Sequence, residues 1–262
     1  MQRGLTSRLV ALCFDANNPL GLAGFWAAAL RWDIDDETQG VISLVPTDGT
    51  RFCVDFALVS ERKPVGQNRL HLDLTSTSID DQQESVASLI ELGACHIDIG
   101  QRPEEGHVVL ADPEGNEFCI IEPENKFLAG CGRLGAINCE GTREVGYFWS
   151  AALGWPLVWD QDEETAIRAP TPGGYPGTGP LITWGGGPLT PKIGKNRLHL
   201  DIAPEEHVDQ GAEADRLISL GATPIDIGQG DVNWVVMADP DGNEFCVLRG
   251  GDRIPGSESR FP

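Results

Sequence analysis

Two identical hexapeptides carry the residue types best suited to chemistry in this chain. The sequence Asn-Arg-Leu-His-Leu-Asp occupies residues 68–73 and occurs again at residues 196–201. In an extended strand, alternate side chains point to the same face, so Arg69, His71 and Asp73 should share one face and the leucines the other. The leucine face can pack on a core. The opposite face offers a cation, an imidazole and a carboxylate in one line, which suits ligand binding or general base catalysis.

The second hexapeptide offers the same line as Arg197, His199 and Asp201. We predict that His71 and His199 line binding sites and are the candidate catalytic residues, with the neighbouring arginines and aspartates as ligand-binding residues. A strand histidine with an aspartate two residues later is also often a hydrogen-bonded pair without a catalytic role. The sequence leaves both interpretations open.

Two cysteines and two tryptophans complete the predicted ligand-binding residues. Cys119 and Cys246 lie in a second repeated segment, where each is either a nucleophile with a lowered pKa or a small buried side chain. Trp184 and Trp234 occur only in the second half, and aromatic side chains there would suit a flat organic ligand.

The hexapeptides belong to a tandem repeat that covers the chain, and we place the two domains at residues 1–126 and 127–262. A Phe-Trp helix segment, a Leu-Gly-Ala segment and an Asp-Pro-X-Gly-Asn-Glu-Phe-Cys segment recur with them at offsets of 123 to 128 residues. The proline and glycine of the last segment are typical of a hairpin turn.

We predict that each half of the sequence contains a strand, a helix and three strands in this order, and that this order occurs twice in each half. In the first half we expect strands at residues 9–14, 41–45, 52–59, 69–74, 97–99, 107–110 and 118–121, and helices at 20–30 and 80–92. Asn18-Pro19 is a helix-start signal. The second half carries an insertion rich in glycine and proline at residues 170–191, which is either a loop over the second site or a tolerated surface excursion.

Composition limits the possible partners. The net charge of −21 argues against nucleic acid and against an anionic membrane surface, and no apolar run is long enough to span a bilayer. The seven cysteines are odd in number and only one pair of them matches between the repeats, so we expect reduced thiols and a cytoplasmic protein. With two domains in one chain we expect a monomer that binds a small organic molecule.

Together, the repeated strand, the Phe-Trp helix and the Asp-Pro-X-Gly-Asn hairpin resemble the vicinal oxygen chelate superfamily, the glyoxalase, bleomycin-resistance and extradiol dioxygenase group. The resemblance implies an α+β fold of two tandem domains, each built from two βαβββ modules that form a cup-shaped mixed sheet. Members of this superfamily either hold a divalent metal in the cup or bind a small molecule there without one.

The resemblance places metal ligands on the first and last strands of each module, and this pattern is incomplete here. If a metal is present, the ligands would be His71, Glu117 and Cys119, or His199, Glu244 and Cys246. The other candidate donors do not repeat, because Cys13 aligns with Asn138 and Asp55 aligns with Thr183.

We therefore predict a glyoxalase-like protein that binds a small organic molecule without a metal cofactor. The alternative is a lyase, isomerase or dioxygenase that uses zinc, iron, manganese or nickel. The sequence does not decide whether the protein is an enzyme.

Overall fold

Four βαβββ modules build the protein. The structure is a computed structural model and describes residues 6–35, 40–102, 104–171, 176–185, 189, 191–192 and 194–251. The first module contains β1 (Arg8–Ala16), α1 (Pro19–Leu30), β2 (Asp33–Ile34), β3 (Val41–Val45) and β4 (Cys53–Leu58). The second contains β5 (Leu70–Leu74), α2 (Ile79–Glu91), β6 (Cys95–His96), β7 (Val108–Ala111) and β8 (Glu117–Ile120). The third contains β9 (Leu134–Glu140), α3 (Arg143–Leu153), β10 (Leu157–Gln161), β11 (Glu164–Pro170) and β12 (Pro176–Gly185). The fourth contains β13 (Leu198–Ala203), α4 (Gln210–Leu220), β14 (Thr223–Pro224), β15 (Val235–Ala238) and β16 (Glu244–Val247).

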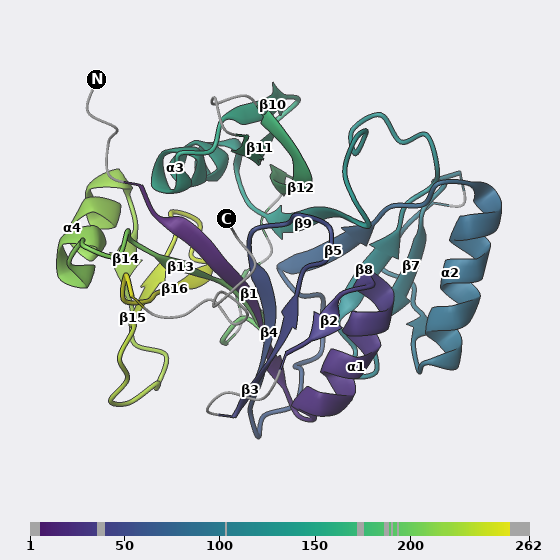
Figure 1. Cartoon of the computed structure of the whole chain (residues 1–262), viewed down its shortest axis with the longest axis horizontal. Coiled ribbons are helices and arrows are strands. Elements are labelled where there is room, and N and C mark those ends of the chain that lie inside the picture. Colours follow the sequence, from purple (N-terminus) through teal and green to yellow (C-terminus); the bar gives the residue numbers. More distant parts are fainter. Residues whose placement is uncertain are drawn as a thin grey trace.

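These modules form two eight-stranded mixed sheets, which confirms the predicted α+β fold class. Sheet A has the order β14-β15-β16-β13-β1-β4-β3-β2, and sheet B has the order β10-β11-β12-β9-β5-β8-β7-β6. In each sheet the first strands of two modules pair antiparallel at the centre, β1 with β13 and β5 with β9. Figure 1 shows the first strand beside β13, from the other end of the chain.

The pairing of the modules differs from the sequence-based expectation. We expected the two modules of residues 1–126 to share one sheet and those of 127–262 to share the other. Instead, sheet A joins the first module to the fourth, and sheet B joins the second to the third. The sequence repeat reflects the duplication of a pair of modules. Which modules share a sheet depends instead on strand pairing, such as that between β1 and β13. Each site is therefore assembled from both halves.

The hydrophobic core lies where α1 and α3 meet the strands. The leucines of the hexapeptide in β5 are buried in this core, as the alternation predicted. Trp26 of α1 packs on Phe14 of its own sheet and on Phe118 of sheet B, with ring centroids 5.4 and 5.1 Å apart. Trp149 of α3 makes the equivalent contact with Phe245 of sheet A at 5.1 Å. We call the opposite face of each sheet, which carries the polar hexapeptide residues, its cup face.

Local signals predicted most element ends correctly. Asn18 caps α1 by accepting a hydrogen bond from the backbone N–H of Gly21 at 3.2 Å, and Pro19 occupies the first turn. The strand expected at 97–99 is wrong, because the short strand β6 ends at His96. Beyond it, the side chain of Gln101 accepts a hydrogen bond from the backbone N–H of Ile99 at 2.8 Å and stabilises a bend.

The loop expected over the second site is also wrong for much of its length. Residues 176–185 form β12, which pairs with β11 on one side and with β9 on the other. Isoleucine, threonine and tryptophan favour a strand, and they outweigh the glycines and prolines that suggested a loop. Residues 172–175, 186–188 and 190 of the expected loop lie outside the described residues.

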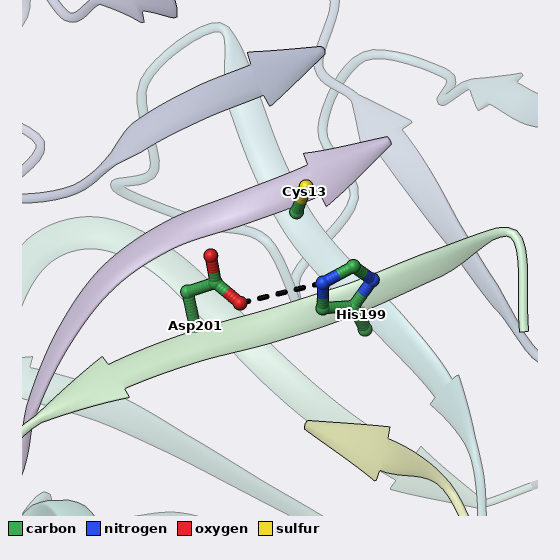
Figure 2. Close-up of side chains that lie close together, drawn as sticks. All are labelled: Cys13, His199 and Asp201. Atoms are coloured by element: carbon green, nitrogen blue, oxygen red, sulfur yellow. Dashed lines mark ion pairs between the residues drawn. The ribbon is translucent and has the colours of Figure 1, made fainter. Parts of the chain in front are cut away.

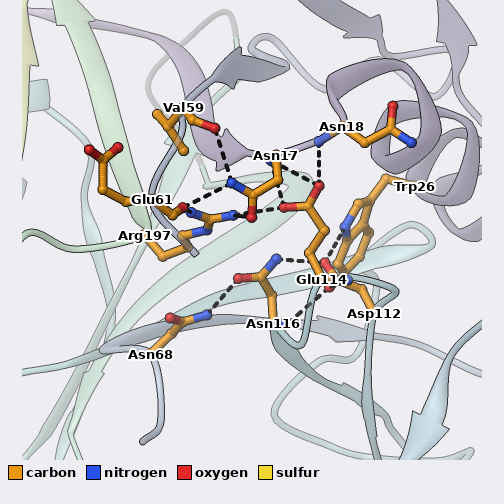
Figure 3. A network of polar contacts seen from close by, with 10 residues as sticks. All are labelled: Asn17, Asn18, Trp26, Val59, Glu61, Asn68, Asp112, Glu114, Asn116 and Arg197. Carbon is orange, nitrogen blue, oxygen red and sulfur yellow. Dashed lines mark hydrogen bonds and ion pairs between the residues drawn. The ribbon is translucent and has the colours of Figure 1, made fainter. Parts of the chain in front are cut away.

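Two arginines of the hexapeptides fasten the sheets to each other. Arg197, next to β13 of sheet A, contacts Glu114 in the β7–β8 hairpin of sheet B at 2.7 Å (Figure 3). It also donates to the carbonyl of Glu61 at 2.7 Å and to the amide oxygen of Asn17 at 3.1 Å. Arg69 makes the symmetric contact, donating to the carbonyl of Asp241 in the β15–β16 hairpin at 3.0 Å. A ligand-binding role for the two arginines stays a prediction, and the contacts described here are with protein groups.

Asp112, the first residue of the β7–β8 turn, stabilises the hairpin that Arg197 contacts. The carboxylate of Asp112 accepts hydrogen bonds from the backbone N–H groups of Glu114 and Asn116, both at 2.9 Å, and from the indole of Trp26 at 3.0 Å. Gly115 adopts φ 88°, which glycine tolerates best. The repeated segment thus makes the predicted turn and also presents Glu114 to the other sheet. No helix in the described ranges has both the length and the apolar character to cross a membrane.

Candidate functional site

The cup faces of the two sheets carry polar clusters at equivalent positions. The sheet A cluster consists of Cys13 on β1, Asp55 on β4, His199 and Asp201 on β13, and Cys246 on β16. Strand register places Cys13 opposite both His199 and Asp55, and Asp201 opposite Cys246. The four strands that supply these residues are adjacent in the order β16-β13-β1-β4. Residues nearly 200 positions apart thus meet at one point.

The sheet B cluster consists of His71 and Asp73 on β5, Cys119 on β8, Asn138 on β9 and Thr183 on β12. The register is the same, with Asn138 opposite both His71 and Thr183, and Asp73 opposite Cys119. The amide of Asn138 lies 3.5 Å from the carboxylate of Asp73. The two clusters share the histidine, the aspartate and one cysteine. They differ because sheet A has a thiol and a carboxylate where sheet B has an amide and a hydroxyl.

Three side chains of the sheet A cluster lie close enough to hold one ion. One donor atom from each of Cys13, His199 and Asp201 lies within 4.8 Å of the other two (Figure 2). The Nε2 atom of His199 is 3.4 Å from Oδ1 of Asp201. The Nδ1 atom of His199 and Oδ1 of Asp55 are buried and make no hydrogen bond with the described residues. Buried polar atoms without a partner are costly, so the cluster is suited to a polar or charged ligand.

Burial and the charges of neighbouring groups shift the pKa values of the sheet A cluster. Burial raises the pKa of the Cys13 thiol to about 12, although the charge of His199 opposes this shift. Burial likewise raises the pKa of Asp55 to about 6, against the hydrogen bond from Ser43. Burial lowers the pKa of His199, but negative charge on Cys13 and Cys246 and the hydrogen bond to Asp201 raise it well above its usual value. A cation at this point would favour the deprotonated forms of the thiols and carboxylates, which burial disfavours.

The sheet B cluster has different chemistry. The Nε2 atom of His71 lies 3.4 Å from Oδ1 of Asp73. Burial acts against protonation of His71, but the hydrogen bond and charge of Asp73, with Glu117, leave its pKa above the usual value. Burial and the charge of Asp73 raise the pKa of the Cys119 thiol. Cys119 is therefore a neutral thiol near pH 7, which disfavours a nucleophilic role and agrees with its place in a small apolar cluster.

A cavity of about 340 Å³ opens on the cup face of sheet B. His71, Asn138 and Thr183 line it from three adjacent strands, and Phe127 also lines it. The ring of Phe127 is held edge-on against Trp159, with centroids 5.5 Å apart. This volume lies in the lower part of the range of small-molecule sites.

The glutamates predicted as alternative metal ligands have other partners. Glu117 accepts hydrogen bonds from the ammonium of Lys63 at 2.8 Å and from the backbone N–H of Asn68 at 3.1 Å. Glu244 makes the equivalent ion pair with Lys192. The groups of close donor atoms contain the hexapeptide aspartates and not these glutamates. The carboxylates at the start of the last strands thus fasten the segments that lead into the hexapeptides.

The two tryptophans predicted to bind a ligand lie in different environments. Trp184 is buried on β12, where its indole stacks on that of Trp149 at a centroid distance of 6.3 Å, and it also lines the 340 Å³ cavity. Trp234 is 41% exposed in the segment before β15 and lies outside the lining of that cavity. The structure therefore brings Trp184 near the sheet B cluster and leaves Trp234 at the surface.

Sequence reasoning did not bring Cys13 and Asp55 together with His199. Both residues belong to the first half of the sequence, and their counterparts Asn138 and Thr183 are not acidic or thiol donors. Under the expectation that each half forms its own cup, Cys13 would have joined His71. The missing signal was the pairing of β1 with β13, which no local pattern in the sequence encodes.

Comparison with known proteins agrees with the fold and with the repeat. The model of the glyoxalase-like domain matches residues 11–121 and again residues 136–248. Among solved structures, glyoxalase I from Zea mays aligns over 95% of this chain and 94% of its own, with a TM-score of 0.62 and 12% identity. A candidate dioxygenase from Bacillus subtilis strain 168 aligns over 97% of this chain and 88% of its own, with a TM-score of 0.60 and 15% identity.

At such identities the structural likeness concerns the fold. A search of curated proteins gave no significant match. The two domain matches together span most of the chain and coincide with the two copies of the hexapeptide and hairpin. The chain therefore belongs to the glyoxalase-like domain family of the vicinal oxygen chelate superfamily.

Proposed function

We propose that the protein binds a small organic molecule on the cup face of sheet B and needs no metal at that site. The observation that carries this proposal is the cavity of about 340 Å³ lined by His71, Asn138 and Thr183. Amide and hydroxyl groups stand there at the positions where the sheet A cluster has a thiol and a carboxylate. Neither group is a strong ligand for a divalent transition metal, whereas both form hydrogen bonds with organic molecules.

The lining also indicates the charge of the ligand. Glu140 and Glu164 line the cavity, and its described lining contains neither lysine nor arginine. Glu140 is partly balanced by Arg69, 3.9 Å away, whereas none of the ion pairs among the described residues involves Glu164. The cavity therefore favours a neutral or cationic molecule over an anionic one, and the ring of Phe127 offers a surface for an apolar or aromatic part of it.

A comparison of the two histidines tests this proposal. The intact protein would be screened against neutral, cationic and anionic organic compounds by ligand-observed NMR, and the hits would be titrated by isothermal calorimetry. His71→Ala should abolish or strongly weaken binding of the hits, while His199→Ala should leave it unchanged because His199 lies in sheet A. Equal loss in both variants, or hits confined to anions, would contradict the proposal.

A second candidate function, divalent metal chemistry, is favoured by the sheet A cluster. The fit is good, because thiol, imidazole and carboxylate donors of Cys13, His199 and Asp201 converge within 4.8 Å and Asp55 adds a buried oxygen without a hydrogen bond. A divalent ion held by these residues would supply Lewis acidity and polarise substrate oxygens. Asp201 lies beside the ring of His199, with its Oδ1 atom 3.4 Å from Nε2.

A further inference from the structure

We propose that Cys13 and Cys246 are thiolate ligands of a thiophilic divalent metal ion of the zinc class, held with His199 and Asp201 in sheet A and absent from sheet B. This inference rests on the second candidate function and deepens it by naming the kind of metal, the ligands and the sheet. It concerns a different cup from the one proposed to bind an organic molecule.

The position of the two thiols supports their role as a pair. Cys13 approaches His199 from β1, and Cys246 approaches His199 and Asp201 from β16, on the other side of β13. Both thiols are buried, and neither cysteine forms a disulfide bond. Cys13, His199 and Asp201 form the group of close donor atoms, and Cys246 stands opposite Asp201 and interacts with His199 and Asp201 from the other side. A second sulfur therefore lies next to the three donors.

The distances leave room for tetrahedral coordination after a small contraction. Zinc bonds of about 2.0 to 2.3 Å place neighbouring ligand atoms roughly 3.3 to 3.8 Å apart. The donor atoms of Cys13, His199 and Asp201 lie within 4.8 Å of one another, so each pair needs to close by no more than about 1.0 to 1.5 Å. Rotation of side chains can supply such a movement without a change of strand register.

The donor types decide which metal is preferred. Thiolates favour zinc and other soft ions, whereas magnesium, calcium and manganese prefer sites made only of oxygen. A coordinated thiol is deprotonated by the metal, and its proton passes to solvent, so burial of the free thiols does not prevent ligation. His199 binds a metal through a ring nitrogen as the neutral imidazole, so the proton that its raised pKa favours also passes to solvent when the ion binds.

Sheet B serves as an internal comparison within the same chain. His71, Asp73 and Cys119 also lie within 4.8 Å of one another, so this cluster has one imidazole, one carboxylate and one thiol. The position of Cys13 is taken by Asn138 and that of Asp55 by Thr183. With a single thiol and an amide in place of the second, sheet B lacks the sulfur pair that would select zinc.

Cobalt substitution gives a direct readout of the thiolates. The full chain, purified without a histidine tag and treated with a chelator, would be titrated with Co²⁺ and followed by absorption spectroscopy. We expect about one Co²⁺ per chain, with visible bands of tetrahedral cobalt and a near-ultraviolet band from sulfur-to-cobalt charge transfer. Zn²⁺ should displace the cobalt stoichiometrically, and an excess of Mg²⁺ should not.

Variants at matched positions decide which cup is used. Cys13→Ser and Cys246→Ser should each weaken the charge-transfer band and lower Zn²⁺ affinity by at least about 10- to 100-fold, the range known for loss of an outer-shell partner. Cys119→Ser, the sheet B counterpart of Cys246→Ser, should change neither. The double variant N138C/T183D, which copies the sheet A donors into sheet B, should bind a second equivalent. Circular dichroism of the metal-free variants checks that each is folded.

Two results would overturn the inference. Cobalt that binds without a charge-transfer band would show an oxygen and nitrogen site, which would refute the thiolate ligands and leave the second candidate function intact. No binding of Co²⁺ or Zn²⁺ to the folded protein would refute both. Neither result concerns the organic ligand of sheet B, which is tested separately with His71→Ala.

Discussion

Removal of the Arg197 side chain should destabilise the protein strongly. The guanidinium lies 2.7 Å from the carboxylate of Glu114, and the side chains of the two residues are 4% and 12% exposed. Arg197→Ala would leave the carboxylate of Glu114 in a buried position without its positive partner. Loss of one member of a buried ion pair costs about 3–5 kcal/mol of unfolding free energy.

Two features of the structure refine that magnitude. The carboxylate of Glu114 also accepts hydrogen bonds from the backbone N–H groups of Asn17 and Asn18, at 2.9 and 2.7 Å, and these remain in the variant. The carbonyl of Glu61 and the amide of Asn17 lose a donor at the same time. The first effect lowers the cost and the second raises it, but the first concerns a charged group and the second only neutral oxygens, so we expect a value near the lower end, about 3 kcal/mol. For a protein of this size that corresponds to a fall in melting temperature of roughly 6–12 °C.

Urea unfolding followed by circular dichroism and tryptophan fluorescence measures the loss. A double-mutant cycle with Glu114→Ala should give a coupling energy above about 1 kcal/mol, because the two side chains contact each other directly. Arg31→Ala is the matched surface control, since Arg31 pairs with Asp81 at 3.5 Å with a side chain that is 67% exposed, and it should cost less than about 1 kcal/mol. If Arg197→Ala costs no more than Arg31→Ala, the fastening of the sheets by Arg197 is refuted.

The titration of His71 and the packing of two helical glycines give further tests. The pKa of His71 lies above its usual value chiefly because Asp73 outweighs the effect of burial, so Asp73→Asn should lower this pKa in an NMR titration. The sign follows from linkage: the stabilisation by protonated His71 is fully present below about pH 6.5 and is lost as pH rises through the folded-state pKa, and the variant should lose this dependence. Gly146 of α3 faces Thr165 so closely that a Cβ would lie 1.9 Å from its hydroxyl, and Gly146→Ala should cost about 1–3 kcal/mol in urea unfolding. Gly24→Ala in α1, where a Cβ would meet nothing within 4 Å, should instead stabilise by about 1 kcal/mol, and the same sign for both glycines would contradict these contacts.

Local physical chemistry made much of the fold predictable. Alternation of leucine with polar residues in the hexapeptides predicted which face of β5 is buried, because a strand has a period of two. Asn18 and Pro19 predicted the start of α1, and the Asp-Pro-X-Gly-Asn segment predicted a hairpin, because caps and turns depend only on neighbouring residues. These features need no knowledge of the rest of the chain.

The partners of the modules were not predictable in this way. β1 can pair with any strand that offers an apolar face and a free edge, and the repeat provides several such strands. The choice of β13 depends on contacts far apart in sequence, among them Arg197 with Glu114 and Arg69 with the hairpin at Asp241. From the sequence we predicted that the same two arginines bind a ligand. Strand alternation gives the face on which a side chain lies, but it does not give the groups that the end of the side chain contacts.

The crossed pairing also explains how one duplicated chain can have two different cups. Each cup takes its histidine, the aspartate of the hexapeptide and one cysteine from one half of the sequence and its two remaining residues from the other half. The two clusters differ at two positions. Sheet A has Cys13 and Asp55 where sheet B has Asn138 and Thr183. A change in the first module therefore alters sheet A alone, although the hexapeptide it meets is identical to that of sheet B. Because β1 pairs with β13 and β4 in sheet A, and Cys13 is not among the residues that line the cavity around His71, a thiol at position 13 can shape a metal site without entering that cavity, and the two proposed functions can diverge independently.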